Sequence, residues 1–296
     1  MGNAWLHRYS VLVLVCTFLL VIAGGLVTSN EAALAIPDWP LSYGKLVPPL
    51  EGGIRFEFAH RMLAATVALL TLILAFWIQA SEQRLWLRRL GWMAVGAVLA
   101  QALLGGAAVK FVDPKPLSIA HACLAQICFG VMVAVVVGYA LACPPEDQHQ
   151  HWQAKAYPTV LAATAILLQT ALGAAVRHNL TSAIPHIVGA GISTALVMWA
   201  GLGILIHHME DTLLRRYATL LLSLTFVQVF LGVAAYMSRI ATADDPQPMP
   251  MMIGFTVAHV AAGSLTFGAA VALALIVYRD ARPANAVLAH GGMAVA

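Results

Sequence analysis

Four histidines stand at matching places in the sequence, each early in a long apolar segment: His60, His121, His186 and His259. Each is predicted to lie one to two helical turns inside a membrane span, which is roughly 5–10 Å below the outer boundary at 1.5 Å per residue. A single histidine at that depth is often a hydrogen-bonded core residue. Four at one depth indicate a function, because polar side chains inside a membrane are costly.

Paired histidines at one depth are typical of a haem site. A haem iron takes two axial ligands from opposite faces, and two histidines on facing helices of a four-helix bundle can supply them. We therefore predict that His60 pairs with His121 and that His186 pairs with His259. Zinc fits less well, because it prefers three or four clustered ligands, often with cysteine or carboxylate. A proton relay would not require matched pairs.

The first of these histidines has a carboxylate beside it. Glu57 and His60 are three residues apart and share a helix face, and Arg61 follows directly. The matching positions before the other histidines hold Ser118, Ala183 and Thr256. A carboxylate beside a haem could accept a proton or stabilise a developing cation, so Glu57 is the candidate catalytic residue. The alternative is a first-turn acid that the helix dipole favours.

The elements that must position these residues are membrane spans. The chain has 296 residues, of which 61% are hydrophobic and 10% are charged, whereas about 25% of a soluble domain is charged. The net charge of +3 is too small and too scattered for a nucleic-acid binder. A helical span needs about 20 apolar residues. We therefore predict an all-α integral membrane protein with eight transmembrane helices, at 9–29, 55–80, 90–110, 117–142, 157–177, 183–206, 217–239 and 252–278.

A repeated phrase indicates how these spans are grouped. Three segments end on Q-x-x-L-G, starting at Gln101, Gln169 and Gln228, while the first ends more loosely on AGGLVTS. The glutamines either pack between helices or line a polar pocket. The unit is a helical hairpin used four times, which predicts two pseudo-symmetric four-helix bundles related by an axis along the membrane normal. The predicted domains are a first bundle at 1–145, a second at 146–280 and a flexible cytoplasmic tail at 281–296.

The distribution of lysine and arginine predicts the orientation. The connections that contain "EQRLWLRR" and "LLRRY" hold more lysine and arginine than the connections on the other side of the membrane. We therefore expect both termini in the cytoplasm and the haem sites near the outer face. Only eight residues precede the first predicted span, which is too short for a transit peptide and favours a bacterial plasma membrane. No outward loop holds a cysteine, and we expect Cys16, Cys123, Cys128 and Cys143 to pack as small hydrophobes.

The longest outward loop, residues 30–54, contains the aromatic phrase "PDWPLSYG". Loops of this length without regular structure are usually functional or disordered. Its apolar and aromatic content favours a cover over the site below. The alternative for Trp39 and Tyr43 is anchoring at the membrane interface.

Together these features resemble the haem A synthase family. The resemblance rests on "GGLVTS", "LAIPDWPLSYGKLVPP", "GGIRFEFAHRMLA" and the three later histidines with their Q-x-x-L-G hairpins, and it covers essentially the whole chain. It departs from the family at one point. Many bacterial members carry a cysteine pair in the first outer loop, where this chain has Ile36 and Ser42.

The resemblance implies an oxidoreductase that converts the C8 methyl group of haem O to a formyl group, giving haem A for cytochrome oxidase. It places the substrate haem at His60 and His121 of the first bundle, and a permanent haem b, which passes electrons, at His186 and His259 of the second. Glu57 falls on the essential glutamate, with an acid–base or cation-stabilising role. The implied partners are haem O, the lipid bilayer, haem O synthase and the cytochrome oxidase assembly machinery, with no nucleic acid.

Two other functions remain open from the sequence. One is a di-haem membrane cytochrome that only transfers electrons. The other is a haem-binding assembly protein without chemistry of its own. Glu57 and the difference between the two halves favour the enzyme over the cytochrome.

Overall fold

The computed structural model describes residues 4–141 and 153–280, and these ranges form eight long helices. Their bounds are α1 (Ala4–Ser29), α2 (Ile54–Ser81), α3 (Leu85–Lys110), α4 (Lys115–Ala140), α5 (Gln153–Arg177), α6 (Ile184–His207), α7 (Thr212–Ala241) and α8 (Pro250–Asp280). All eight are long and apolar enough to cross a membrane. The eight predicted spans are therefore confirmed, and α1, α3 and α7 begin five residues earlier than predicted. Cys143, the predicted boundary at 145 and the tail at 281–296 lie outside the described residues.

The helices form because lipid offers no hydrogen-bond partner to the backbone, so each span must satisfy its own peptide groups. Polar and proline residues mark the ends. Asp211 caps α7 by accepting hydrogen bonds from the backbone nitrogens of Leu213 and Leu214, and Pro114 precedes α4 in an extended conformation. Arg84, just before α3, donates to the carbonyl oxygen of Gly138 and so ties the α2–α3 turn to the far end of α4.

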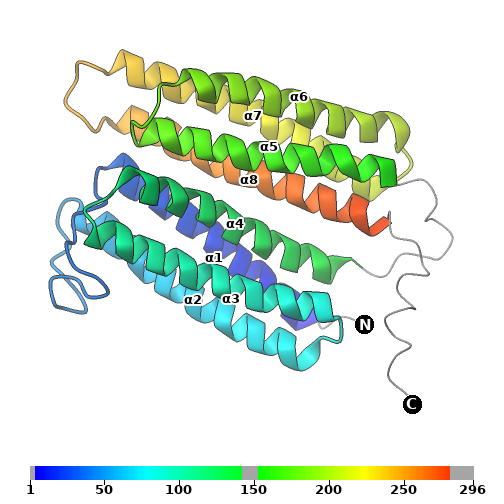
Figure 1. Cartoon of the computed structure of the whole chain (residues 1–296), viewed down its shortest axis with the longest axis horizontal. Coiled ribbons are helices and arrows are strands. Elements are labelled where there is room, and N and C mark those ends of the chain that lie inside the picture. Colours follow the sequence, from blue (N-terminus) through cyan, green and yellow to red (C-terminus); the bar gives the residue numbers. More distant parts are fainter. Residues whose placement is uncertain (1–3, 142–152, 281–296) are drawn as a thin grey trace.

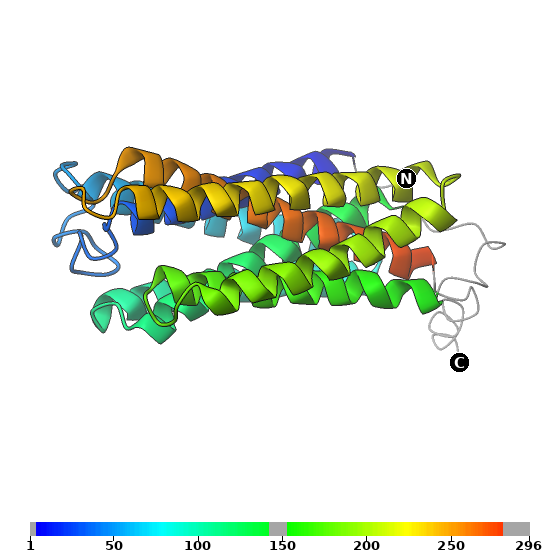
Figure 2. The same ribbon diagram turned by 90° about the horizontal axis from the view of Figure 1, so that it is seen from above.

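The helices pack as two groups of four that lie side by side (Figures 1 and 2). In the first group α1 contacts α2, α2 contacts α3, α3 contacts α4, and α4 closes on α1. The second group repeats this order from α5 to α8. We call the end with the α1–α2, α3–α4, α5–α6 and α7–α8 connections the histidine end. The pseudo-symmetry and the functional division into two domains stay predictions.

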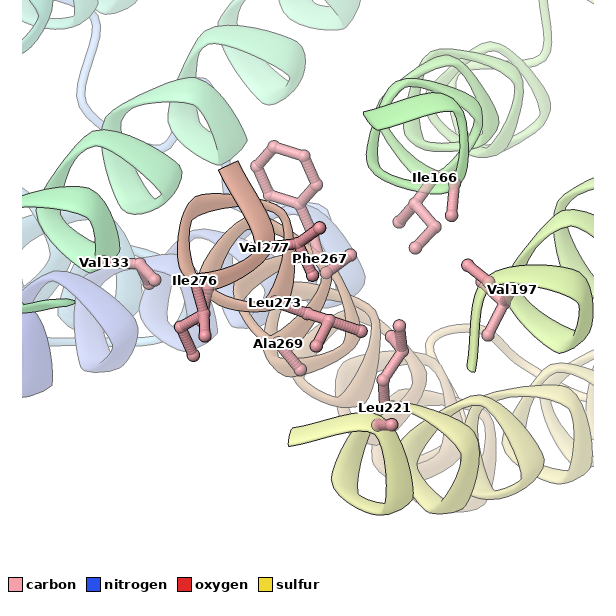
Figure 3. Close-up of a cluster of buried hydrophobic side chains, with 14 of the residues drawn as sticks. Val133, Ile166, Val197, Leu221, Phe267, Ala269, Leu273, Ile276 and Val277 are labelled. Atoms are coloured by element: carbon pink, nitrogen blue, oxygen red, sulfur yellow. The ribbon is translucent and has the colours of Figure 1, made fainter. Parts of the chain in front are cut away.

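Helix α8 lies at the centre of the molecule. It contacts α5 and α7 of its own group and α1 and α4 of the other, and 61% of its span is buried. Its buried face includes Leu273, Ile276 and Val277 in the largest apolar cluster (Figure 3). The α4–α8 contact is close, because a β-carbon at Gly130 would lie 2.8 Å from the ring of Phe267.

One polar contact crosses the same interface. The amide nitrogen of Gln126 on α4 donates to the hydroxyl of Ser264 on α8 over 2.9 Å, and both residues are buried. Such a bond between membrane helices contributes about 0.6 kcal/mol on average. The two groups are therefore joined mainly by apolar packing around α8.

Candidate functional site

Each of the four histidine rings packs against a glycine of the preceding helix. A β-carbon at that glycine would lie 2.8–3.2 Å from Cε1 of the ring, which is closer than a side chain can approach without a shift. The four pairs are Gly24 with His60, Gly105 with His121, Gly173 with His186 and Gly232 with His259. The absence of a side chain at each glycine therefore gives the ring its place in the bundle.

The prediction of one common depth is wrong for two of the histidines when depth is counted from the end of the helix. His186 lies only two residues after Ile184, the start of α6, whereas His259 lies nine residues after Pro250, the start of α8. The reason is that α7 and α8 each run nine residues beyond the Gly232–His259 contact, whereas α5 runs four and α6 two residues beyond the Gly173–His186 contact. The glycine contact, and not the distance from the helix end, sets the level of the ring.

The Q-x-x-L-G phrase places a glutamine on the same helix face as the glycine, because the two are four residues apart. Each glutamine contacts the histidine that its glycine touches. The amide nitrogen of Gln101 donates to the carbonyl oxygen of His121 over 3.0 Å, and that of Gln169 donates to the carbonyl oxygen of His186 over 2.7 Å. The glutamines thus bond across a helix interface, as the packing alternative expects, and they hold the histidines in position. The role in lining a polar pocket stays a prediction.

The ring spacing of the second histidine pair matches that of two ligands of one metal, although Nδ1 of His186 faces the amide nitrogen of Gln169. The ring centroids of His186 and His259 are 6.2 Å apart and the ring planes are at 87°. A ligating imidazole nitrogen lies about 2 Å from its metal, and the ring centroid lies roughly 1 Å further away, so two rings on one iron have centroids about 6 Å apart. The observed spacing fits a haem held between the two rings.

The hydrogen bonding of His259 also suits metal ligation. Its Nδ1 lies 3.1 Å from the carbonyl oxygen of Gln228, and a carbonyl oxygen can only accept, so Nδ1 carries the proton. In the neutral ring this leaves the lone pair on Nε2, which lies 3.4 Å from the side-chain nitrogen of Gln228 and is open to a metal once that amide turns away. In many metal sites a histidine ligand donates its other N–H to a backbone carbonyl, which fixes the ring orientation.

The first histidine pair is less completely satisfied by the protein. Nδ1 of His60 and Nδ1 of His121 are both buried and make no well-aligned hydrogen bond in the described part of the chain, although the backbone of Leu20 and that of Gln101 lie within reach of the two rings. Leu20, four residues before Gly24, stands where the other three hairpins have a glutamine. Two buried imidazoles with unpaired nitrogens also fit a haem.

The carboxylate of Glu57 faces the first loop and Arg61. Its Oε2 accepts a hydrogen bond from the backbone nitrogen of Ile36 over 2.7 Å, and its Oε1 lies 2.5 Å from Nη2 of Arg61. Glu57 is only 4% exposed. The same Arg61 side chain donates to the carbonyl oxygens of Ile36, Asp38 and Leu41. The two charged residues beside His60 therefore fasten the loop onto α2.

The loop is also folded back on itself. The carboxylate of Asp38 accepts from the backbone nitrogens of Tyr43 and Gly44, at 2.6 and 2.8 Å. These bonds, that from Gly44 first, hold the pKa of Asp38 below its usual value. The hydroxyl of Tyr43 donates to the carbonyl oxygen of Ala35. The loop is therefore ordered by short hydrogen bonds within residues 35–44.

Trp39 docks the loop onto α3. A β-carbon at Gly106 would lie 2.7 Å from the Trp39 ring, so the indole packs directly on this glycine, which follows Gly105 in the sequence. A hollow of about 660 Å³ opens beside it, lined by Trp39, Leu103 and Lys110 among others. The position of Trp39 supports a cover over the first pair, although about half of its side chain stays exposed.

The two positions of the missing cysteine pair are both buried. Ile36 is fully enclosed and is held by Glu57 and Arg61, while Ser42 exchanges two backbone hydrogen bonds with Lys45. The loop is thus closed at these positions by packing and hydrogen bonds.

Several residues of the site were not singled out from the sequence as ligand-positioning groups. The four glycines were expected only to pack helices, although their spacing of four from each glutamine is a signal of a shared face. The docking of Trp39 on Gly106 has no such signal. It depends on how the loop folds over the bundle.

Comparison with known proteins places the chain in a family. A family model described as cytochrome oxidase assembly protein matches residues 7–55 and 53–185. The chain belongs to this cytochrome oxidase assembly family. A haem A synthase of Shouchella clausii is 28% identical over 283 residues, which are 91% of this chain and 90% of the relative.

Other relatives of the cytochrome oxidase assembly family match shorter stretches. A haem A synthase of Parvibaculum lavamentivorans is 32% identical over 140 residues, covering 43% of this chain and 40% of the relative. A haem A synthase of Symbiobacterium thermophilum is 37% identical over 91 residues, covering 31% of this chain and 30% of the relative. The resemblance stated from the sequence is confirmed at the level of the family.

Proposed function

We propose that this chain is a haem A synthase, an oxidoreductase that converts the C8 methyl group of haem O to a formyl group. Family membership supports the overall activity. The observation that carries the proposal is the difference between the two histidine pairs. The first pair has a carboxylate–arginine couple one helical turn from His60, whereas Ala183 and Thr256 stand at the matching positions of the second pair, whose rings contact Gln169 and Gln228. Electron transfer alone does not need a carboxylate–arginine couple beside the haem.

His186 and His259 hold a resident haem b in this proposal, supported by their 6.2 Å centroid spacing and by the hydrogen bond from His259 to Gln228. When bound, that haem would supply electron transfer. The chain's own contribution is to fix both rings, through the glycine contacts and the glutamine hydrogen bonds, so that little rearrangement accompanies a change of charge. His60 and His121 hold the substrate haem by the same glycine contacts.

Glu57 stabilises positive charge as it develops at the substrate during oxidation of the methyl group. Its support is geometric: the carboxylate is fixed between a guanidinium and a peptide N–H, and such charge-assisted bonds keep it aimed in one direction. A preoriented anion in a low-dielectric site interacts more strongly with a cation than the same group in water. Arg61 is the positioning residue for Glu57.

The cellular setting is part of the same proposal. We place both termini in the cytoplasm of a bacterial plasma membrane and the histidine end on the outer side. Residues 1–145 form the substrate half, and 146–280 form the haem b half. Haem O synthase is the expected source of substrate, and cytochrome oxidase is the expected recipient of the product.

The decisive experiment is extraction of pigment from cells that co-express this chain with a haem O synthase. Haem A in the extract supports the proposal. Haem b alone, in a strain where an authentic haem A synthase makes haem A, would support the di-haem cytochrome instead. Haem O bound without conversion would support the assembly protein.

A further inference from the structure

Three cationic side chains converge at the histidine end, between the two groups of helices. Lys115, at the start of α4, donates from Nζ to the carbonyl oxygen of Asn179 over 3.0 Å. Arg239, in the last turn of α7, donates to the side-chain oxygen of the same Asn179 over 3.1 Å. Arg177, at the end of α5, donates to the carbonyl oxygen of Thr28 on α1 over 2.7 Å. We call Lys115, Arg177 and Arg239 the cationic cluster.

The hydrogen-bond acceptors of the cationic cluster are all neutral. In the residues that the structure describes, the ion pairs within 4.0 Å are Arg61 with Glu57 and Arg84 with Glu82, so no carboxylate lies at that distance from the cluster. Glu31 acts on Arg177 only from further away. The positive charge of the cluster is thus left without an anion in direct contact, which is costly for Arg177 because it is partly buried, whereas Arg239 and Lys115 are exposed.

The two arginines of the cationic cluster are aligned with the second histidine pair, while Lys115 comes from α4, the helix of His121. Arg177 is four residues after Gly173, and Arg239 is seven residues after Gly232. Both arginines therefore lie on the helix face whose glycine contacts a histidine, one and two turns nearer the histidine end. The equivalent positions of the first group hold Thr28, four residues after Gly24, and Val112, seven residues after Gly105 and just beyond the end of α3.

The chemistry of the cationic cluster suits a carboxylate. Arginine binds carboxylates and phosphates through paired N–H groups, and lysine adds a point charge. A haem carries two propionate carboxylates on one edge of the ring. A haem between His186 and His259 whose propionate edge points to the histidine end would present these groups to Arg177 and Arg239.

We propose that Arg177, Arg239 and Lys115 bind the propionate carboxylates of the haem held by His186 and His259. The inference rests on the proposed function of His186 and His259 as haem ligands. It adds the residues that determine which edge of that haem faces the histidine end. A phospholipid phosphate at the membrane surface has the same chemistry, and the experiment below separates the two sources.

The experiment titrates the purified full-length protein, stripped of haem, with protohaem and with protohaem dimethyl ester, whose carboxylates are blocked. The low-spin absorption spectrum reports binding. The variants are Arg177→Gln, Arg239→Gln and their combination. The matched control is Arg216→Gln, an exposed arginine near the opposite end of α7. Lys115→Gln changes an exposed side chain, and it replaces the arginine variants in the experiment if those fail to fold. Bound phosphorus is measured in every sample.

We expect wild type and Arg216→Gln to bind the free acid about tenfold or more tightly than the ester, since charge-assisted hydrogen bonds are lost with the ester. The double variant, and in part Lys115→Gln, should lose that preference. Equal binding of acid and ester by wild type overturns the inference, as does a preference that survives in the double variant. A fall in bound phosphorus without any acid–ester difference identifies a lipid phosphate and also overturns it. Failure of both haems to give a low-spin spectrum with wild type would instead refute the histidine ligation in the proposed function.

Discussion

The side-chain nitrogen of Gln169 lies 2.9 Å from Nδ1 of His186 and 2.7 Å from the carbonyl oxygen of the same residue. One amide on α5 therefore fixes both the ring and the backbone of a histidine on α6. Gly173, one turn along α5, supplies the surface against which that ring rests. Position and orientation of the candidate ligand are thus set by a single face of the neighbouring helix.

Adding one methyl group to that face should weaken haem binding. In Gly173→Ala or Gly232→Ala, the new β-carbon would lie 2.9 or 2.8 Å from a histidine Cε1, so the ring must shift. Overpacking of this kind costs about 1–3 kcal/mol, which corresponds to roughly a 5- to 150-fold loss of affinity for haem b in spectroscopic titrations. Gly191→Ala and Gly203→Ala are the controls, since nothing lies within 4 Å of their β-carbons. An unchanged affinity in the first two variants would contradict the packing argument.

Removal of either ligand of the second pair should abolish the low-spin haem b spectrum. His186→Ala and His259→Ala each leave one axial position without an imidazole. His178→Ala is the matched control, because this histidine lies in the α5–α6 connection, next to Arg177. The ligand assignment is wrong if the spectrum of the purified protein survives both changes.

The charge of Glu57 can be separated from its role in holding the loop. Glu57→Gln keeps an oxygen that can accept from Ile36 but removes the charge, whereas Glu57→Ala removes both. We expect both variants to retain haem and to lower formyl production by about 100-fold or more, as for loss of one preorganised electrostatic group. Only Glu57→Ala should also speed hydrogen exchange at the Ile36 amide.

The readout is the haem type extracted from cells that supply haem O. Glu82→Ala is the control, since it breaks the ion pair with Arg84 at the opposite end of the molecule. Haem A production at the wild-type level in Glu57→Gln would show that the charge has no part in the reaction.

The turn held by Asp38 should respond to acid. Its pKa is lowered, chiefly by the hydrogen bond from Gly44, so the carboxylate form is favoured in the folded loop. That contribution is complete above the ordinary pKa of 3.8 and is lost as the pH falls through the lowered value. We expect the Tyr43 and Gly44 amides to lose protection from hydrogen exchange, beyond the intrinsic effect of pH, only below about pH 4. In Asp38→Asn this step should be absent.

The sequence predicted the eight spans because a membrane helix needs a long run of apolar residues. It singled out the four histidines as candidate ligands because a polar residue stands out within such a run. It did not predict that Glu57 binds the backbone of Ile36. That partner is a peptide N–H 21 residues away, and it has no side-chain signature. The contact of Arg177 with Thr28 was equally hidden, since it depends on how two apolar groups of helices meet, and lipid-facing and protein-facing surfaces have similar compositions.

The central place of α8 has a consequence for how the protein is made. Helices enter the membrane in chain order, so α1–α4 can associate while the later spans are still being synthesised. Helix α8 is the last of the eight, and it is the one that contacts α1 and α4 as well as α5 and α7. The α4–α5 contact can form as soon as α5 is inserted, but the surface of α1 and α4 that α8 covers stays open to lipid until the final span is in place.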